Sequence, residues 1–173
     1  MSTFTPAPRH ARGASTSVAE PTSTVAEPVE AQQGIDPRGP QLTAAMTAVV
    51  LIAILLAPPV VAGVLAAVQA VLFGLGAVRG VQHTIHAAFF KRFVRPRLSA
   101  PTELEDPAPP RFAQAVGLGF TAVALIGYAT GLTLLGQIAI GFALVAALLN
   151  AIFRFCLGCE LYLLIKRVTH QTT

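Results

Sequence analysis

Four long apolar runs dominate this sequence and most constrain what the chain can fold into. They extend over Leu42–Ala57, Val60–Val78, Phe112–Leu135 and Ile138–Ile165. A helix needs about 20 apolar residues to cross the hydrocarbon core of a bilayer. Only 12% of the residues are charged, against about 25% in a typical soluble domain, so the chain has too little charge to cover a soluble surface. The sequence predicts an integral membrane protein and excludes a cytosolic enzyme, a disordered regulator and a disulfide-rich secreted module.

The breaks between the runs predict an all-α protein whose four transmembrane helices form two hairpins. Pro58-Pro59 ends the first run, because a helix rarely continues through two prolines. Gly136-Gln137 is the predicted turn between the last two runs. The fourth run would reach about 42 Å if it were helical throughout, so we expect it to tilt strongly or to leave the bilayer early. The expected spans are 42–57, 60–78, 112–135 and 138–157 or longer.

The positive charges predict the orientation of these helices. Neither predicted turn contains Lys or Arg, whereas segment 79–111 carries six such residues and Lys166 and Arg167 follow the last run. Loops rich in Lys and Arg stay in the cytoplasm. Both termini and segment 79–111 are therefore expected to be cytoplasmic.

Segment 79–111 has the composition of a basic loop that lies in the membrane interface. Aromatic and cationic residues alternate in it until Pro96 stops any helix. This pattern is typical of a short interfacial helix with aromatic rings toward acyl chains and cations toward anionic headgroups. A nucleic-acid role is not expected, since the positive-inside bias already explains the charges. The aromatic residues are Phe89, Phe90 and Phe93, and the expected headgroup contacts are Lys91, Arg92, Arg95 and Arg97.

Residues 1–40 differ from the rest of the chain and predict a disordered, low-complexity cytosolic tail. Two near-copies of one heptapeptide, Ser15–Pro21 and Thr22–Pro28, follow each other directly. A segment so rich in Pro, Ser and Thr has too little apolar surface to offset the entropy of ordering. No apolar run of signal-peptide length precedes Gln41. The predicted domains are the tail, 1–40, and the membrane domain, 41–173.

Similar segments around the two hairpins suggest an internal duplication. Asp36–Pro40 and Asp106–Pro110 both read D-P-x-x-P, and each precedes the first helix of a hairpin. Phe73–Ala77 also resembles Phe155–Cys159, although the spacing between the paired segments differs. A parallel repeat would give a compact four-helix bundle.

The cysteine pair Cys156 and Cys159 is the feature most suggestive of chemistry. About 20 residues counted from Ile138 put the inner hydrocarbon boundary near Leu157, and hence the pair at the cytoplasmic interface. On a continuous helix, Cys156, Cys159 and Glu160 would share one face, and Asn150 and Arg154 another. A disulfide at this spacing would need a bend or a helix start, which Gly158 permits. Arg154, Glu160 and Asn150 are the candidate tuning residues around the thiols.

Three roles remain open for the pair at this point. In a reducing compartment, two cysteines at this spacing indicate catalytic thiols or a metal site. His83 and His86 could complete a zinc set with Cys156 and Cys159, but interfacial positions for the two histidines are the favoured interpretation. The cysteines could also be small packing residues. No cofactor is expected.

The chain resembles a family of small four-span membrane proteins of unknown function from high-GC bacteria. The resemblance covers residues from about 35 to 168. It implies a plasma-membrane location and a link with thioredoxin-like and sulfurtransferase-like proteins, without an established activity; the histidines match none of its motifs. It rests on Ile35–Pro40 (IDPRGP), Val94–Leu98, Glu105–Gln114 including PPRFAQ, and Phe155–Tyr162 (FCLGCELY).

The leading hypothesis is thus a membrane partner in thiol redox or sulfur handling, in which Cys156 and Cys159 react with a cytosolic thioredoxin-like or sulfurtransferase-like protein. The competing hypothesis is a structural or assembly subunit without chemistry, which forms a homo-oligomer through small residues in its helices. A metal-binding protein is the third.

Overall fold

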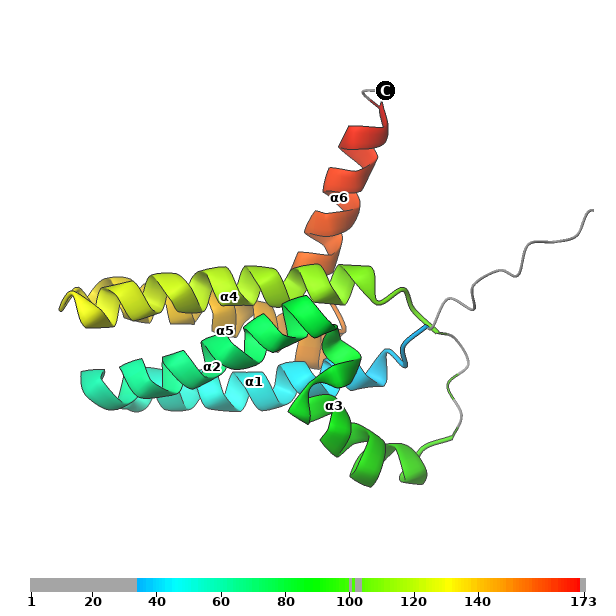
Figure 1. Cartoon of the computed structure of the whole chain (residues 1–173), viewed down its shortest axis with the longest axis horizontal. Coiled ribbons are helices and arrows are strands. Elements are labelled where there is room, and N and C mark those ends of the chain that lie inside the picture. Colours follow the sequence, from blue (N-terminus) through cyan, green and yellow to red (C-terminus); the bar gives the residue numbers. More distant parts are fainter. Residues whose placement is uncertain (1–33, 100, 102–103, 172–173) are drawn as a thin grey trace, which may run out of the picture. The chain divides into compact units, whose positions relative to one another are not determined.

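The computed structural model describes residues 34–99, 101 and 104–171. Within these residues the fold contains six α-helices and no β-strand (Figure 1). Residues 1–33 of the predicted tail lie outside the described part. Residues 38–40 already belong to the first helix, so the predicted boundary at residue 40 is too late. The α-helices are α1 (Arg38–Leu56), α2 (Pro59–Arg79), α3 (Ile85–Phe89), α4 (Ala108–Ala129), α5 (Thr133–Phe153) and α6 (Leu157–Gln171).

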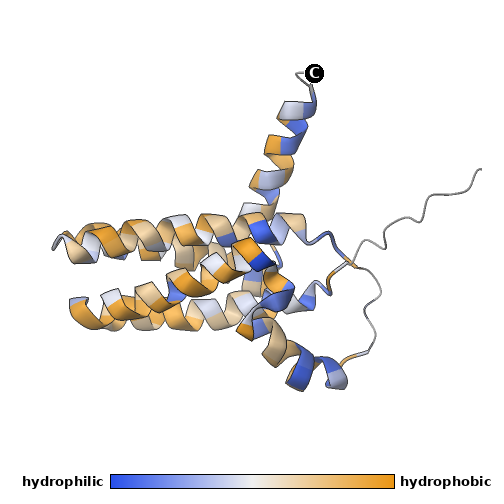
Figure 2. Cartoon of the chain, viewed as in Figure 1, coloured by the Kyte–Doolittle hydropathy of each residue, from blue (hydrophilic) through white to orange (hydrophobic). Residues whose placement is uncertain are grey.

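Helices α1, α2, α4 and α5 are each long and apolar enough to cross a membrane. They have 19 to 22 residues, so each extends for about 30 Å at 1.5 Å per residue. Figure 2 shows that their surfaces are apolar over most of their length and that hydrophilic residues gather at one end. Since few of their side chains are buried inside the molecule, the apolar surface must face lipid. The chain is a multi-pass membrane protein.

The four long helices pack as a ring in the order α1, α2, α4, α5. Its core consists mostly of alanine with a few larger side chains, among them Leu51, Ile54 and Ile140. Small residues let helix backbones approach closely, which is how helices associate in a membrane without a hydrophobic driving force. At Gly117, an added Cβ would lie 2.7 Å from the Phe73 ring of α2, so any other residue there would require the ring to shift.

The breaks between the long helices confirm one predicted turn and correct the other. Ala57 and Pro58 join α1 to α2 as expected. The predicted turn at Gly136-Gln137 is wrong, because both residues lie inside α5. Residues 130–132 connect α4 to α5, and Gly131 there has a φ of 78°, a conformation that glycine adopts without strain. The prediction placed this turn too late because Thr133, Leu134 and Leu135, at the start of α5, continue the apolar run.

The two D-P-x-x-P segments form the same local structure. The Asp36 carboxylate accepts a hydrogen bond from the Arg38 N–H at 3.0 Å, and the Asp106 carboxylate accepts one from the Ala108 N–H at 2.8 Å. Each aspartate therefore satisfies a free N–H at the start of a long helix. The segments also meet, because Ile35 and Glu105 exchange two backbone hydrogen bonds in an antiparallel bridge.

Equivalent features follow along both halves of the described chain. Helices α2 and α5 each have 21 residues, and each is followed by a residue with positive φ, Gly80 at 90° and Arg154 at 57°. A short helix then packs back on the first helix of its own half, α3 on α1 and α6 on α4. The predicted match of Phe73–Ala77 with Phe155–Cys159 is wrong, because the first segment is inside α2 and the second spans the break before α6.

Segment 79–111 contains several short helical elements, whereas the sequence predicted one short interfacial helix. After α3, a π-helical turn covers Phe90–Val94 and a 3₁₀ turn covers Arg95–Arg97. Phe89 and Phe93 are exposed with ring centroids 5.1 Å apart, whereas Phe90 is buried near Gly39 of α1. The expectation that Phe90 faces lipid is therefore wrong. Lys91, Arg92, Arg95 and Arg97 are all exposed.

Candidate functional site

The fourth apolar run is broken where the sequence suggested one continuous helix. Helix α5 ends at Phe153, and Arg154 adopts a left-handed conformation with φ of 57° and ψ of 22°. The N–H groups of Arg154 and Phe155 donate to the carbonyls of Asn150 and Leu149, which satisfies the last turn of α5. Helix α6 then begins at Leu157 and leaves the bundle at a steep angle (Figure 1).

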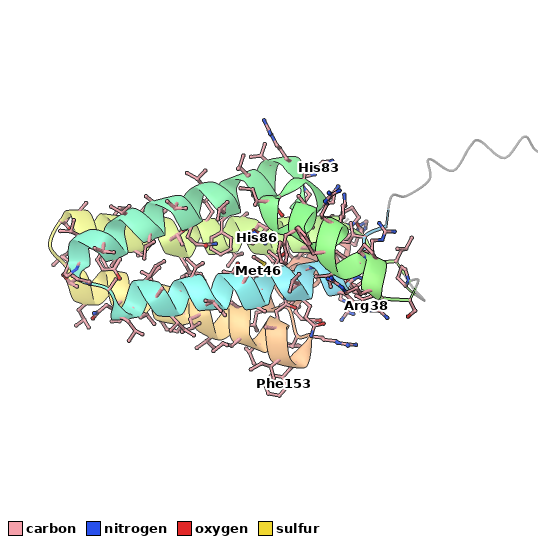
Figure 3. The ribbon with its side chains drawn as sticks, turned by 90° about the horizontal axis from the view of Figure 1, so that it is seen from below. Arg38, Met46, His83, His86 and Phe153 are labelled. Carbon is pink, nitrogen blue, oxygen red and sulfur yellow. A yellow bond between two sulfur atoms is a disulfide. The ribbon has the colours of Figure 1, made fainter. Side chains whose placement is uncertain are left out.

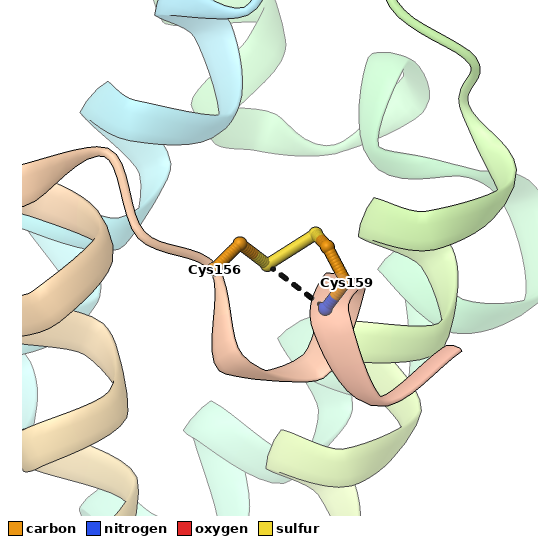
Figure 4. Close-up of a disulfide and its surroundings, with 2 residues drawn as sticks. All are labelled: Cys156 and Cys159. Atoms are coloured by element: carbon orange, nitrogen blue, oxygen red, sulfur yellow. Dashed lines mark hydrogen bonds between the residues drawn. A yellow bond between two sulfur atoms is a disulfide. The ribbon is translucent and has the colours of Figure 1, made fainter. Parts of the chain in front are cut away.

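This break creates the helix start that a bond between Cys156 and Cys159 requires. The two cysteines form a disulfide, with Cα atoms 5.2 Å apart. Cys156 immediately precedes α6 and Cys159 lies in its first turn. The Cys159 N–H donates to the Cys156 Sγ at 3.3 Å (Figure 4). The Glu160 N–H donates to the Cys156 carbonyl at 3.0 Å. Cys156 thus acts as the N-terminal cap of α6.

Gly158 brings the pair against α4. A Cβ added to Gly158 would lie 2.6 Å from both the Cα and the Cβ of Ala113, which is closer than a side chain can approach. The rings of Phe112 and Tyr162 also meet, with centroids 5.8 Å apart. These contacts fix the first turn of α6 on the start of α4, so the glycine between the cysteines has a packing role.

The disulfide lies at the rim of a cavity of about 760 Å³. The cavity extends between α1, α4 and α5 and is bounded at one end by the start of α6. Three residues with side-chain amides, Gln41, Gln114 and Asn150, line it together with Arg154. Gln41 is held in place because its amide donates to the Ala151 carbonyl at 2.9 Å. The site therefore combines a half-buried sulfur pair with polar groups from three further helices or their ends.

The predicted site residues are brought together only in part. Cys156, Cys159, Asn150 and Arg154 line the same cavity. Glu160 is exposed and does not line it, and no ion pair joins it to Arg154 within the described residues. The expectation that Cys156, Cys159 and Glu160 share one face of a continuous helix is wrong because the helix begins between the two cysteines.

The zinc set is not assembled. Among the residues that the structure describes, no three His, Cys, Asp or Glu side chains lie close enough to hold a metal ion. Both histidines lie in the segment around η1 (Val81–His83) and α3, where the His83 ring nitrogen contacts the Arg79 carbonyl at 2.9 Å (Figure 3). His86 is buried in α3, and this burial lowers its pKa. The combination of Cys156, Cys159, His83 and His86 as ligands is therefore wrong.

Sequence reasoning missed the contributions of α1 and α4 to the cavity. Gln41 and Gln114 each stand near the start of an otherwise apolar run, and Gln114 ends the PPRFAQ motif. A polar side chain at such a depth usually faces protein or a cavity. The sequence thus shows two glutamines in apolar runs. It does not predict the helix packing that brings them to the same cavity as the cysteines.

The fold and the site define a multi-pass membrane protein with a cysteine pair at the end of a helical bundle. The chain belongs to the family described as Domain of unknown function (DUF4395), which matches residues 35–167. The match includes the bundle, both D-P-x-x-P segments and the cysteine pair. No curated protein and no solved structure matches the chain.

Proposed function

We propose that this protein exchanges electrons with a partner dithiol or disulfide through Cys156 and Cys159, on the cytoplasmic side of the plasma membrane. The observation that carries the proposal is the position of the pair, which closes as a disulfide at the start of α6 and lines an open cavity. A disulfide that faces a reducing compartment is usually transient and catalytic rather than a static link.

Cys156 is the cysteine that bonds to the partner. As a thiolate its sulfur would accept the Cys159 N–H and lie at the N-terminus of α6, and both features stabilise negative charge. A partner thiolate attacks Cys156 Sγ, the Cys156–Cys159 bond breaks, and Cys159 leaves as the thiolate. The partner's second thiolate then attacks its own sulfur in the mixed disulfide, which releases the reduced pair and the partner disulfide. A thioredoxin-like or sulfurtransferase-like protein has the thiol chemistry that this exchange requires.

The test is the capture of the mixed disulfide in cells that express the full-length protein. With Cys159→Ser, the Cys156 thiolate can attack a partner disulfide, but this chain has no second thiol to resolve the adduct. We therefore expect protein-sized adducts on non-reducing gels that disappear after reduction. Cys156→Ser is the matched control and should give far fewer adducts. If neither variant forms a reducible adduct, the proposal is wrong and a structural role for the pair takes its place.

The orientation in the membrane is part of the proposal. The exposed cations of segment 79–111 and those of α6 lie at the same end of the bundle as the cysteines (Figure 2). The positive-inside rule assigns this end to the cytoplasm, with Ala57-Pro58 and residues 130–132 outside. In a cysteine-free background, a membrane-impermeant maleimide should label Thr130→Cys in intact cells. Ser99→Cys should react only after the cells are permeabilised, and the reverse pattern would overturn the orientation.

Anionic lipid headgroups are the proposed partners of the basic segment. Lys91, Arg92, Arg95 and Arg97 are exposed beside the exposed rings of Phe89 and Phe93. This arrangement supports a segment that lies in the interface, since each cation near an anionic surface contributes about 1 kcal/mol.

A further inference from the structure

The cavity beside the disulfide extends from a polar rim into the apolar part of the bundle. On α1 its lining runs from Arg38 to Thr47, about 14 Å along the helix axis at 1.5 Å per residue. Its volume of about 760 Å³ is within the range of cavities that enclose small organic ligands. The cavity is lined by residues of the membrane-spanning helices α1, α2, α4 and α5.

The lining is suited to a flat apolar ring that carries carbonyl groups. Phe73, Phe120 and Phe142 line the inner part, and the rings of Phe120 and Phe142 stack with centroids 6.2 Å apart. Toward the rim, the half-buried side-chain amides of Gln114 and Asn150 make no hydrogen bond to any described residue. Half-buried amides without a protein partner are available as donors to a ligand oxygen.

The number of cysteines in the chain limits how the reduced pair can pass its electrons onward. The chain contains two cysteines, and both are in the pair. A second thiol pair that could pass electrons onward is therefore absent from this chain. If a partner dithiol reduces the pair, a non-protein acceptor beside it can restore the disulfide without a further thiol pair.

We propose that the cavity binds a lipid-soluble quinone, which reoxidises the reduced Cys156–Cys159 pair. This inference rests on the proposed function. The two S–H bonds of the reduced pair break and one S–S bond forms, so the cysteines lose two electrons and two protons. The quinone gains both, and its two carbonyl groups become the hydroxyl groups of the hydroquinone. A protein disulfide is a much weaker oxidant than a quinone, so electrons flow from the reduced pair to the ring.

The experiment follows the closure of the disulfide in the full-length protein. The reduced protein in phospholipid nanodiscs is mixed without oxygen with decylubiquinone, whose ring has no free position for thiol addition. Disulfide formation is read from a maleimide gel shift, and quinone loss from its ultraviolet absorbance. We expect one quinone consumed per disulfide formed, and no reaction with Cys156→Ser.

Two variant pairs test whether the reaction uses the cavity. Ala146→Phe fills the cavity and should slow closure by about tenfold or more, since misplacing reactants by about 1 Å can cost that much. Ala122→Phe on the exposed face of α4 is its control and should react as the wild type does. Gln114→Leu removes a rim donor and should also slow closure, whereas Gln137→Leu, exposed on α5, should not.

The outcomes separate this inference from the proposed function. If the quinone reacts at equal rates with wild type and both cavity variants, the quinone proposal is wrong. The thiol exchange still stands in that case if diamide closes the pair and the partner adduct forms. Mass spectrometry that finds only phospholipid in the cavity under saturating quinone would also overturn it. If no partner adduct forms, the proposed function fails, whatever the quinone does.

Discussion

At the scale of single residues, the site depends on a few positions where the backbone leaves little choice. Arg154 is the only non-glycine residue with positive φ in the described part of the chain. Such a conformation costs a residue with a Cβ about 1–2 kcal/mol. The equivalent position after α2 is Gly80, which adopts positive φ freely. We propose that an arginine is kept at this strained position because its side chain acts on the neighbouring thiols.

Arg154→Gly separates the backbone from the side chain. The variant should keep the turn and raise the free energy of unfolding by up to about 1 kcal/mol, because glycine removes the steric cost. It should also slow the reaction of Cys156 with a partner disulfide, since the nearby cation is lost. Thermal unfolding in detergent and the rate of adduct formation measure the two effects. A faster reaction in Arg154→Gly would contradict the assigned role.

Gly158 tests the packing of the pair. Gly158→Ala should lower the free energy of unfolding by about 1–3 kcal/mol, the usual cost of overpacking, because the new methyl group would overlap Ala113. Gly141→Ala is the matched control, since a Cβ there meets nothing within 4 Å. Thermal unfolding of both variants in detergent checks the difference. Equal stability of the two would show that α6 does not pack closely on α4.

At the scale of elements, the short helices after α2 and α5 decide how the polar end of the bundle is built. Helix α3 is capped by Thr84, whose hydroxyl accepts the Ala87 N–H at 3.3 Å and donates to the Val81 carbonyl at 2.9 Å. Helix α6 is capped by Cys156, whose sulfur accepts the Cys159 N–H in the same way. The cysteine pair thus occupies the cap position that a threonine fills in the other half.

Helix α3 should make the stability depend on pH through His86. Burial lowers the pKa of His86 below its ordinary value of 6.5, so the unfolded chain binds the proton more readily than the folded one. Stability therefore rises with pH and is lost as the pH falls below about 6.5. The melting temperature in detergent should drop between pH 7.5 and 5.5, and His86→Leu should reduce this drop. His83→Leu, at an exposed position, should leave it unchanged.

Helix α6 has an exposed apolar stripe that suits the membrane interface. Leu157, Leu161, Leu164 and Val168 recur at helical spacing, and all are exposed. The chain has no tryptophan, so a single introduced one reports its own surroundings. Leu164→Trp should emit at shorter wavelength and be quenched by brominated lipids, whereas Lys166→Trp on another face should not. If neither tryptophan is quenched, α6 lies in water and the assignment to the interface is wrong.

The limits of sequence reasoning are clearest at this scale. Hydrophobicity alone identified four helices, because apolar length sets what can cross a bilayer. It could not locate the break between α5 and α6, since Phe155, Leu157, Leu161 and their neighbours continue the apolar run across it. Of the predicted site residues, the cysteines, Asn150 and Arg154 line one cavity, and their roles stay predictions. The position of the Gln41 and Gln114 amides, on α1 and α4, depends on how the helices pack. Helices that are apolar on every side carry little sequence pattern from which this packing could be predicted.

At the scale of the whole molecule, the bundle has the internal symmetry that a duplication would produce. Helices α1 and α4 correspond, as do α2 and α5, and the contacts of α1 with α5 repeat those of α4 with α2. The Ile35–Glu105 bridge joins equivalent positions of the two halves. We infer a parallel repeat in which the second copy gained the cysteine pair at the cap of its short helix.

One pair of contacts provides a direct test of this equivalence. Gln41 of α1 donates to the Ala151 carbonyl at the end of α5, and Arg111 of α4 donates to the Ala77 and Val78 carbonyls at the end of α2. Each side chain therefore satisfies carbonyls at the end of a helix from the other half, as the ends of helices require. The two residues occupy the same place after their D-P-x-x-P segments.

The equivalence predicts that the two side chains can be exchanged. Gln41→Ala and Arg111→Ala should each lower the free energy of unfolding by about 1–2 kcal/mol, because helix-end carbonyls lose their donor. Gln41→Arg and Arg111→Gln should keep most of the stability, since each site accepts the residue found in its counterpart. Thermal unfolding of the four variants in detergent measures this, with Gln137→Ala as an exposed control. If the exchanges are as destabilising as the alanine variants, the two sites differ in shape, and the symmetry does not extend to the side chains that hold the halves together.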